Sequence, residues 1–171
     1  MKHVALAVLF GFVALMNPAP SQAGRILPKI TSVTWYSLAV TNFAAAPGLE
    51  ETAAEMTRSV RDILAHSGPF PFTQSDELNA ETVGIDAPPQ FSFWRNRGIG
   101  LLVVASVKEA PDGRLEVGFR LWNTFTEGQV AGKTYLASPE FKDRLARTLA
   151  GEIFEILDDN YRSVLSKIDR R

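Results

Sequence analysis

The stretch from Pro88 to Phe125 constrains the fold more than any other part of this chain. It reads PPQFSFWRNRGIGLLVVASVKEAPDGRLEVGFRLWNTF. Pro89–Arg97 is expected to form a short helix, because proline is favoured at the first helical position. Gly100–Lys108 is typical of a strand buried on both faces. Asp112-Gly113 marks a hairpin turn, after which Leu115–Phe125 alternates apolar and polar residues. The order predicts a short helix followed by an antiparallel hairpin.

The segments before this stretch add a strand and a helix. Ser32–Phe43 is rich in β-branched and aromatic residues, which favours a strand. Leu49–His66 carries apolar residues at helical spacing and is predicted as a helix. Phe70–Thr73 is expected to form a short edge strand, since Pro71 cannot donate to a ladder. The polar run Asp76–Ala87 is expected to be a loop.

The segments after the hairpin complete an α+β pattern. Gln129–Ala137 is predicted as a third antiparallel strand. Ser138-Pro139-Glu140 is a strong helix start, because it combines a cap, a proline and an acidic residue. The apolar stripe that follows predicts a helix running nearly to the last residue, and Asp158-Asp159-Asn160 is where that helix would break. The elements together predict one α+β domain over residues 24–171.

The first 23 residues have the features of a cleaved secretory signal. Lys2 and His3 give a short basic start, and small residues precede the cleavage expected after Ala23. The apolar run from Val4 to Met16 has 13 residues, whereas crossing a membrane core takes about 20. We therefore expect export to the periplasm without a stable membrane anchor.

Cysteine content and charge exclude several classes of protein. The chain has no cysteine, which excludes an acylated lipoprotein cysteine, a disulfide framework, a thiolate metal site and a cysteine nucleophile. Loss of Lys2 with the signal lowers the basic count from 18 to 17, against 19 acidic residues, which leaves a net charge of −2. Such a balance gives no electrostatic reason to expect nucleic acid or anionic lipid as a partner.

No residue pattern points to reaction chemistry. His66 is the only histidine left after cleavage, and it is better explained as a group at a helix C-terminus than as a base. The pairs Glu50-Glu51 and Asp158-Asp159 diverge by about 100° on a helix, so neither converges on one substrate atom. Gly98-Ile99-Gly100 precedes a strand, whereas a dinucleotide fingerprint follows one. We expect no catalytic, cofactor-binding or metal-binding residues and no enzymatic activity.

Four residues are the candidates for binding a partner: Trp94, Arg95, Arg97 and Trp122. Tryptophan and arginine are enriched at interaction hot spots. Core packing competes with this interpretation, because Trp94 could seat the short helix on the sheet together with Phe91. Trp122 falls on the opposite strand face from Leu121, where it could pack under a helix or lie exposed.

Several short runs, taken in chain order, carry a resemblance to a known family. They are Pro89-Gln90-Phe91, Trp94-Arg95, Leu101-Leu102-Val103-Val104, Asp112-Gly113-Arg114, Phe119-Arg120-Leu121-Trp122, Gln129, Gly132 and Tyr135, with further similarity in Leu38-Ala39-Val40 and in the segment from Arg144 to Leu157. In this order they resemble the N-terminal domain of the TolB family, periplasmic proteins of the Tol-Pal envelope system. The resemblance covers about residues 33–157.

This resemblance implies a five-stranded mixed sheet with two main helices. It also implies a non-enzymatic protein-interaction module that serves envelope integrity or Tol-dependent transport, with TolA-like or Pal-like envelope proteins as partners. TolB proteins carry a β-propeller after this domain, whereas this sequence ends at Arg171 in a basic helix, so we expect a stand-alone domain. The family segment that controls binding to Pal is not recognisable in residues 24–31.

Two other functions stay open from the sequence. A domain that binds a small ligand or a cell-wall fragment could form a pocket between the sheet and the Pro88–Gly98 segment. A carboxylate-dependent hydrolase would need the acidic pairs to act in a cleft. The sequence gives no indication of the oligomeric state or of the face that binds.

Overall fold

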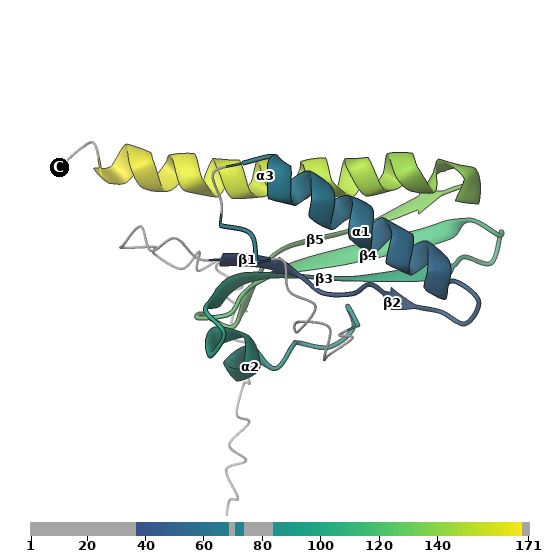
Figure 1. Ribbon diagram of the computed structural model, residues 1–171, viewed down its shortest axis with the longest axis horizontal. Coiled ribbons are helices and arrows are strands. Elements are labelled where there is room, and N and C mark those ends of the chain that lie inside the picture. Colours follow the sequence, from purple (N-terminus) through teal and green to yellow (C-terminus); the bar gives the residue numbers. More distant parts are fainter. Residues whose placement is uncertain (1–36, 69–70, 74–83, 169–171) are drawn as a thin grey trace, which may run out of the picture.

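A mixed sheet of five strands organises the part of the chain that the structure describes, namely residues 37–68, 71–73 and 84–168 of a computed structural model (Figure 1). The strand order is β1-β3-β4-β5, and β2 pairs with the same strand as β1. Their bounds are β1 Ser37–Val40, β2 Ala44–Ala45, β3 Ile99–Glu109, β4 Leu115–Asn123 and β5 Gly128–Ala137. β1 and β2 run parallel to β3, whereas β3, β4 and β5 form an antiparallel meander.

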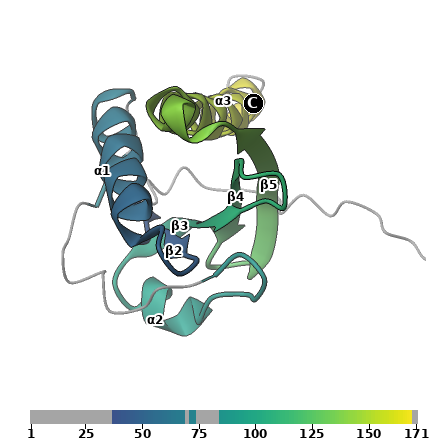
Figure 2. The same ribbon diagram turned by 90° about the vertical axis from the view of Figure 1, so that its right-hand side faces the viewer.

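The helices cover the two faces of the sheet unequally. α1 (Glu50–His66) and α3 (Lys142–Ile168) lie side by side on one face, and the short α2 (Phe91–Arg95) lies on the other (Figure 2). A single 3₁₀ turn, η2 (Pro139–Phe141), leads from β5 into α3. This arrangement confirms the predicted α+β fold with a five-stranded mixed sheet and two main helices.

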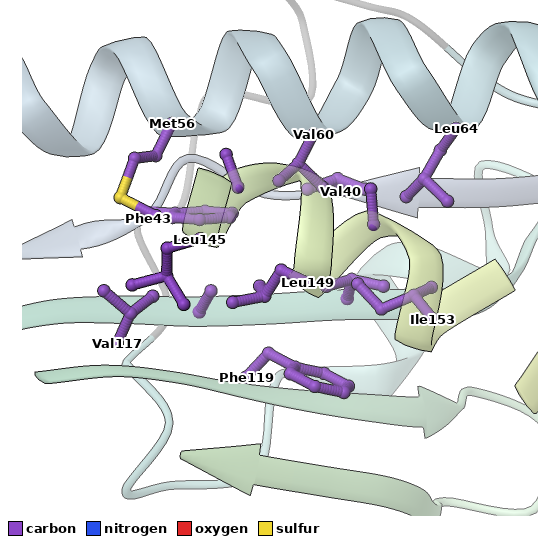
Figure 3. Close-up of a cluster of buried hydrophobic side chains, with 14 of the residues drawn as sticks. Val40, Phe43, Met56, Val60, Leu64, Val117, Phe119, Leu145, Leu149 and Ile153 are labelled. Carbon is purple, nitrogen blue, oxygen red and sulfur yellow. The ribbon is translucent and has the colours of Figure 1, made fainter. Parts of the chain in front are cut away.

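The larger hydrophobic core lies between the α1–α3 layer and the sheet (Figure 3). β4 contributes Phe119 and β3 contributes Val103, while Leu149 and Ile153 enter from α3; all four are 0% exposed. Val60 faces them from α1 and is also fully buried. Each buried aliphatic or aromatic side chain contributes about 1.5–3 kcal/mol, so this layer supplies most of the stabilisation from burial.

Two polar groups within this core region are hydrogen-bonded and fix where β1 ends. The Thr57 hydroxyl donates to the Ala53 carbonyl at 2.7 Å and accepts from the Phe43 amide at 3.0 Å. Arg61 donates from Nη2 to the Val40 carbonyl at 2.8 Å. Because a buried polar group without a partner is costly, these bonds bind the chain after β1 to α1.

The hairpin between β3 and β4 forms where the sequence predicts it. The Arg114 Nε donates to the Asp112 carboxylate at 2.8 Å, and the Arg114 amide donates to the same carboxylate at 3.2 Å. The side-chain hydrogen bond from Arg114, followed by its backbone hydrogen bond, lowers the pKa of Asp112. The Asp112 carboxylate therefore stays ionised and holds the Arg114 side chain within the turn.

Three expectations about element bounds are wrong. Within the described residues, the strand expected to reach Phe43 ends at Val40, because the Phe43 amide donates to Thr57 instead of continuing the ladder. β2 then adds a separate pair of residues. Of the expected strand Phe70–Thr73, the described residues 71–73 form one bridge, Leu38 to Phe72, and not a strand. α3 continues without a break through Asp158, whose carboxylate accepts from Arg162 one turn later at 2.6 Å.

The Ser138 cap is a further difference, since its side chain makes no capping hydrogen bond and the helix starts with a 3₁₀ turn. The predicted signal at residues 1–23, residues 32–36 of the predicted strand and most of the predicted loop Asp76–Ala87 lie outside the described residues.

A matched pair of phenylalanine truncations tests where the core lies. Phe119→Ala removes a side chain that is 0% exposed, and we expect a loss of about 3–5 kcal/mol in the free energy of unfolding. Phe125→Ala removes a side chain that is 47% exposed, and we expect a loss of about 1 kcal/mol or less. Urea unfolding followed by circular dichroism measures both, and equal losses would contradict the assignment of the core.

Candidate protein-interaction surface

Trp94 fixes α2 to the sheet. The side chain is 0% exposed and lies in a second hydrophobic cluster with Ile99, Leu102 and Val104 of β3. The Phe93 ring contacts it edge-on, with 5.1 Å between the ring centroids and 79° between the planes. A five-residue helix has too few backbone hydrogen bonds to persist alone, so this side chain is what holds α2 in place.

The structure corrects the prediction that Trp94 contacts a partner directly, because the side chain has no exposed surface. The alternative, in which it seats the helix on the sheet, is confirmed, although its ring neighbour is Phe93 and not Phe91. Burial of a tryptophan gives more apolar contact than any other residue type, which explains why the sequence places one in so short a helix.

Trp122 reaches the same side of the sheet from β4 and is half-buried. It stands opposite Leu102 in the β3–β4 ladder, and its ring meets Phe91 of α2 edge-to-face at 5.6 Å and 64°. Its indole Nε1–H, like that of Trp94, has no hydrogen-bond partner within the described ranges. The Trp122 Nε1 atom is itself buried, so this donor is unused and shielded from solvent, although the ring as a whole is half-buried.

Arg95 links α2 to the β4–β5 turn. Its Nη1 donates to the Thr124 carbonyl at 2.7 Å and to the Glu127 carboxylate at 2.6 Å. The Thr124 hydroxyl in turn donates to the Ile99 carbonyl at 2.6 Å, so the turn is also tied to β3. Arg95 is therefore held in one position, and Glu127 neutralises its charge.

Arg97 presents a charge that has no acidic partner among the residues described. Its guanidinium lies over the Phe93 ring, 3.6 Å from the centroid, and Nη1 donates to the Phe93 carbonyl at 3.0 Å. The side chain is exposed. An arginine stacked on an aromatic face is pre-organised, so it loses little conformational freedom on binding.

Arg120 joins this group and was missed by the sequence analysis. It precedes Trp122 by two residues on β4, so both point to the same face. Its side chain lies across Gly132 of β5, where an added Cβ would come within 2.5 Å of Arg120 Cδ. The alternation of residues along β4 indicates which face of the sheet Arg120 lies on. Only the pairing of β4 with β5 shows that Gly132 leaves room for the Arg120 side chain.

We call the surface formed by Phe91, Arg95, Arg97, Arg120 and Trp122 the outer patch. It combines three guanidinium groups with two aromatic rings, and Glu127 is the one acidic side chain that pairs with any of these arginines in the described part of the chain. Such a surface can bind carboxylates and stack on apolar side chains. Of the four predicted residues, Arg95 ends α2, Arg97 lies in the turn after it, Trp122 contacts Phe91 of the same helix, and Trp94 is buried beneath it.

The residues considered for catalysis lie elsewhere. His66 is exposed at the C-terminus of α1, where the tautomer protonated at Nδ1 donates to the Asp62 carbonyl at 2.6 Å. Glu50 and Glu51 are exposed in the first turn of α1, on the other face of the sheet from the outer patch. Within residues 37–68, 71–73 and 84–168, no three His, Cys, Asp or Glu side chains gather in a way that could hold a metal ion.

None of the described helices has the length and apolarity that are needed to cross a membrane.

Comparison with known proteins agrees with this architecture. The family model described as the TolB amino-terminal domain matches residues 31–130. The crystal structure of TolB from Acinetobacter baumannii is similar with a TM-score of 0.55 and 20% identity, over 71% of this chain and 28% of that one. The chain thus spans just over a quarter of that TolB.

Two smaller proteins also match in fold comparison. The C-terminal domain of LpoB from Escherichia coli gives a TM-score of 0.49 at 18% identity, over 61% of this chain and 83% of that one. The PelC dodecamer from Paraburkholderia phytofirmans gives a TM-score of 0.47 at 14% identity, over 71% of this chain and 86% of that one. Because the family model covers residues 31–130, more than half of the sequence, the chain belongs to the TolB amino-terminal domain family.

Proposed function

We propose that this chain is a non-enzymatic protein-interaction module of the cell envelope, related to the Tol-Pal system, and that it binds its partner through the outer patch. Membership of the TolB amino-terminal domain family supports the envelope role. The observation that carries the choice of surface is that α2 and the turn after it hold two ring contacts, Phe91 against Trp122 and Phe93 beneath the Arg97 guanidinium. These side chains are held rigidly on a buried anchor yet reach the surface.

The chemistry of the outer patch supports a partner with an acidic surface. Arg97 and Arg120 make no ion pair with an acidic side chain among the described residues. Carboxylates of a partner could pair with both, and the neighbouring rings would exclude water from those pairs. TolA-like and Pal-like envelope proteins are the partners that we propose, in a periplasmic location.

The absence of enzymatic activity is also part of the proposal. A catalytic base needs a nucleophile and an orienting group within hydrogen-bond reach. His66 instead bonds a carbonyl of its own helix at 2.6 Å, and the acidic pair at the start of α1 is exposed to solvent. These contacts support a protein that works through its surface.

Matched arginine variants test the outer patch. We expect Arg97→Ala and Arg120→Ala to weaken binding about tenfold each, because each removes a charge-assisted contact near the centre of the surface. Arg58→Ala is the control, since Arg58 is also an exposed arginine but lies on α1, on the opposite face. Biolayer interferometry with purified periplasmic domains of TolA and Pal from the same organism measures the affinities.

Binding to neither TolA nor Pal would reject the proposed partners. If Arg97→Ala, Arg120→Ala and Arg58→Ala all weaken binding equally, or all leave it unchanged, the outer patch is not the surface that binds the partner. Unfolding curves of each variant verify that the fold is kept.

Cell-wall fragments test the ligand-binding alternative. That function needs a pocket between the sheet and α2, but Trp94 fills this space with a side chain that is 0% exposed. We therefore expect soluble peptidoglycan fragments to cause no concentration-dependent rise in Tm. A rise that saturates with fragment concentration in a thermal-shift assay would favour a ligand-binding domain.

A further inference from the structure

β5 is a long edge strand with little to prevent further pairing. It has ten residues and pairs only with β4 in the described part of the sheet. Natural edge strands are usually protected by charges, proline or short length. β5 contains no proline and one charged residue, Lys133, whose ammonium group pairs with Glu152 of α3. The edge therefore has the character of a strand that pairs with another strand.

Exposed apolar side chains accompany this edge. Three large hydrophobic residues are exposed in the described part of the chain: Phe125 at 47%, Leu136 at 48% and Phe141 at 51%. Leu136 lies on β5, Phe125 in the turn before it and Phe141 in the 3₁₀ turn after it. Phe125 thus lies near the start of the edge, and Leu136 and Phe141 lie near its end. Exposed large hydrophobic residues beside an edge strand favour binding of another chain there.

The exposed flank of α3 beside β5 changes charge along its length. Arg144, Thr148, Gly151 and Glu155 recur at helical spacing, and all four are exposed. This side of α3 lies against β5, because the carboxylate of Glu152, next to Gly151, accepts a hydrogen bond from the Lys133 ammonium group. That hydrogen bond raises the pKa of Lys133, and the negative charge of Glu155 adds to the rise. The flank begins basic at Arg144 and becomes acidic at Glu155. If two copies of this flank lie antiparallel, Arg144 of each copy lies opposite Glu155 of the other.

Small residues lie between these charges. Gly151 is exposed in the interior of α3, where glycine costs about 0.5–1 kcal/mol relative to alanine. A Cβ at Gly151 would meet no atom within 4 Å, so packing inside the described chain does not require the glycine. Close approach of a second helix would use that space.

The centres of the strand and of the charge-changing flank lie close together. Lys133 is near the middle of β5, and it contacts Glu152, which lies within one helical turn of the midpoint between Arg144 and Glu155. One two-fold axis through this point would overlap two copies of β5 along their length. The same axis would bring Arg144 of each copy near Glu155 of the other. Both sets of observations are thus met by a single symmetry operation.

We infer that two copies of this chain pair antiparallel along β5, joining their sheets, with the two α3 helices side by side and Arg144 of each copy facing Glu155 of the other. A heterologous extended peptide would satisfy the strand edge alone. Only a second copy accounts also for the self-complementary charges and for Gly151 between them. The outer patch contributes no residue of β5 or α3, although its Arg120 side chain lies across Gly132 of β5.

Charge reversal tests the dimer in a way that a general loss of stability cannot imitate. We expect the full chain, purified after export, to show a reversible monomer–dimer equilibrium in sedimentation equilibrium. Arg144→Glu and Glu155→Arg each place like charges opposite each other twice, and each should raise the dimer Kd about tenfold or more. An equimolar mixture of the two variants restores both opposite-charge contacts, so its dimer should recover the wild-type Kd.

Two further variants complete the test. Arg58→Glu reverses an exposed charge on α1 and should leave the dimer Kd unchanged. Leu136→Lys adds a charge to the strand edge and should raise the Kd, which ties the dimer to β5 as well as to α3. A chain that stays monomeric up to millimolar concentration overturns the inference. This holds even if an extended peptide binds the edge of β5. A dimer whose two single variants fail to recover on mixing overturns it as well.

Discussion

The burial of β3 on both faces is the constraint on which the rest of this structure depends. Val103 and Ala105 face the α1–α3 layer, whereas Leu102 and Val104 face Trp94, and all are 0% exposed. A strand of this kind is desolvated only when both of its faces are covered. The five-residue helix α2 is therefore not an accessory, because Trp94 closes the face that the long helices leave open.

This arrangement gives the molecule two surfaces with different chemistry. The rigid anchor beneath α2 supports arginines and aromatic rings that offer cationic, stacking contacts to a partner. On the far edge of the sheet, β5 and the flank of α3 offer backbone groups and self-complementary charges. The two surfaces share no residue, but they are neighbours, because the Arg120 side chain of the outer patch lies across Gly132 of β5.

The sequence predicts the elements whose signals are local and misses those that depend on contacts across the fold. The apolar run of β3, the Asp112-Gly113 turn and the proline before α2 each carry their own structural signal. The early end of β1 follows instead from Thr57, which takes the Phe43 amide. The place of Arg120 in the site likewise depends on Gly132, its partner in the β4–β5 ladder, which leaves room for the arginine side chain. The register of that ladder shifts between Leu121 and Trp122. The interaction with Arg162 similarly keeps α3 intact at Asp158.

The buried Trp94 side chain supports the surface that we propose for binding, which Trp122 shares with the arginines. Nuclear magnetic resonance of the indole N–H groups during titration with the partner tests this most directly, since neither group has a hydrogen-bond partner in the described structure. We expect a progressive shift of the Trp122 indole signal and of the Arg97 and Arg120 side-chain signals, with the Trp94 signal shifting less. Saturated binding that leaves these signals unmoved, with shifts confined to α1, would show that the partner binds another surface.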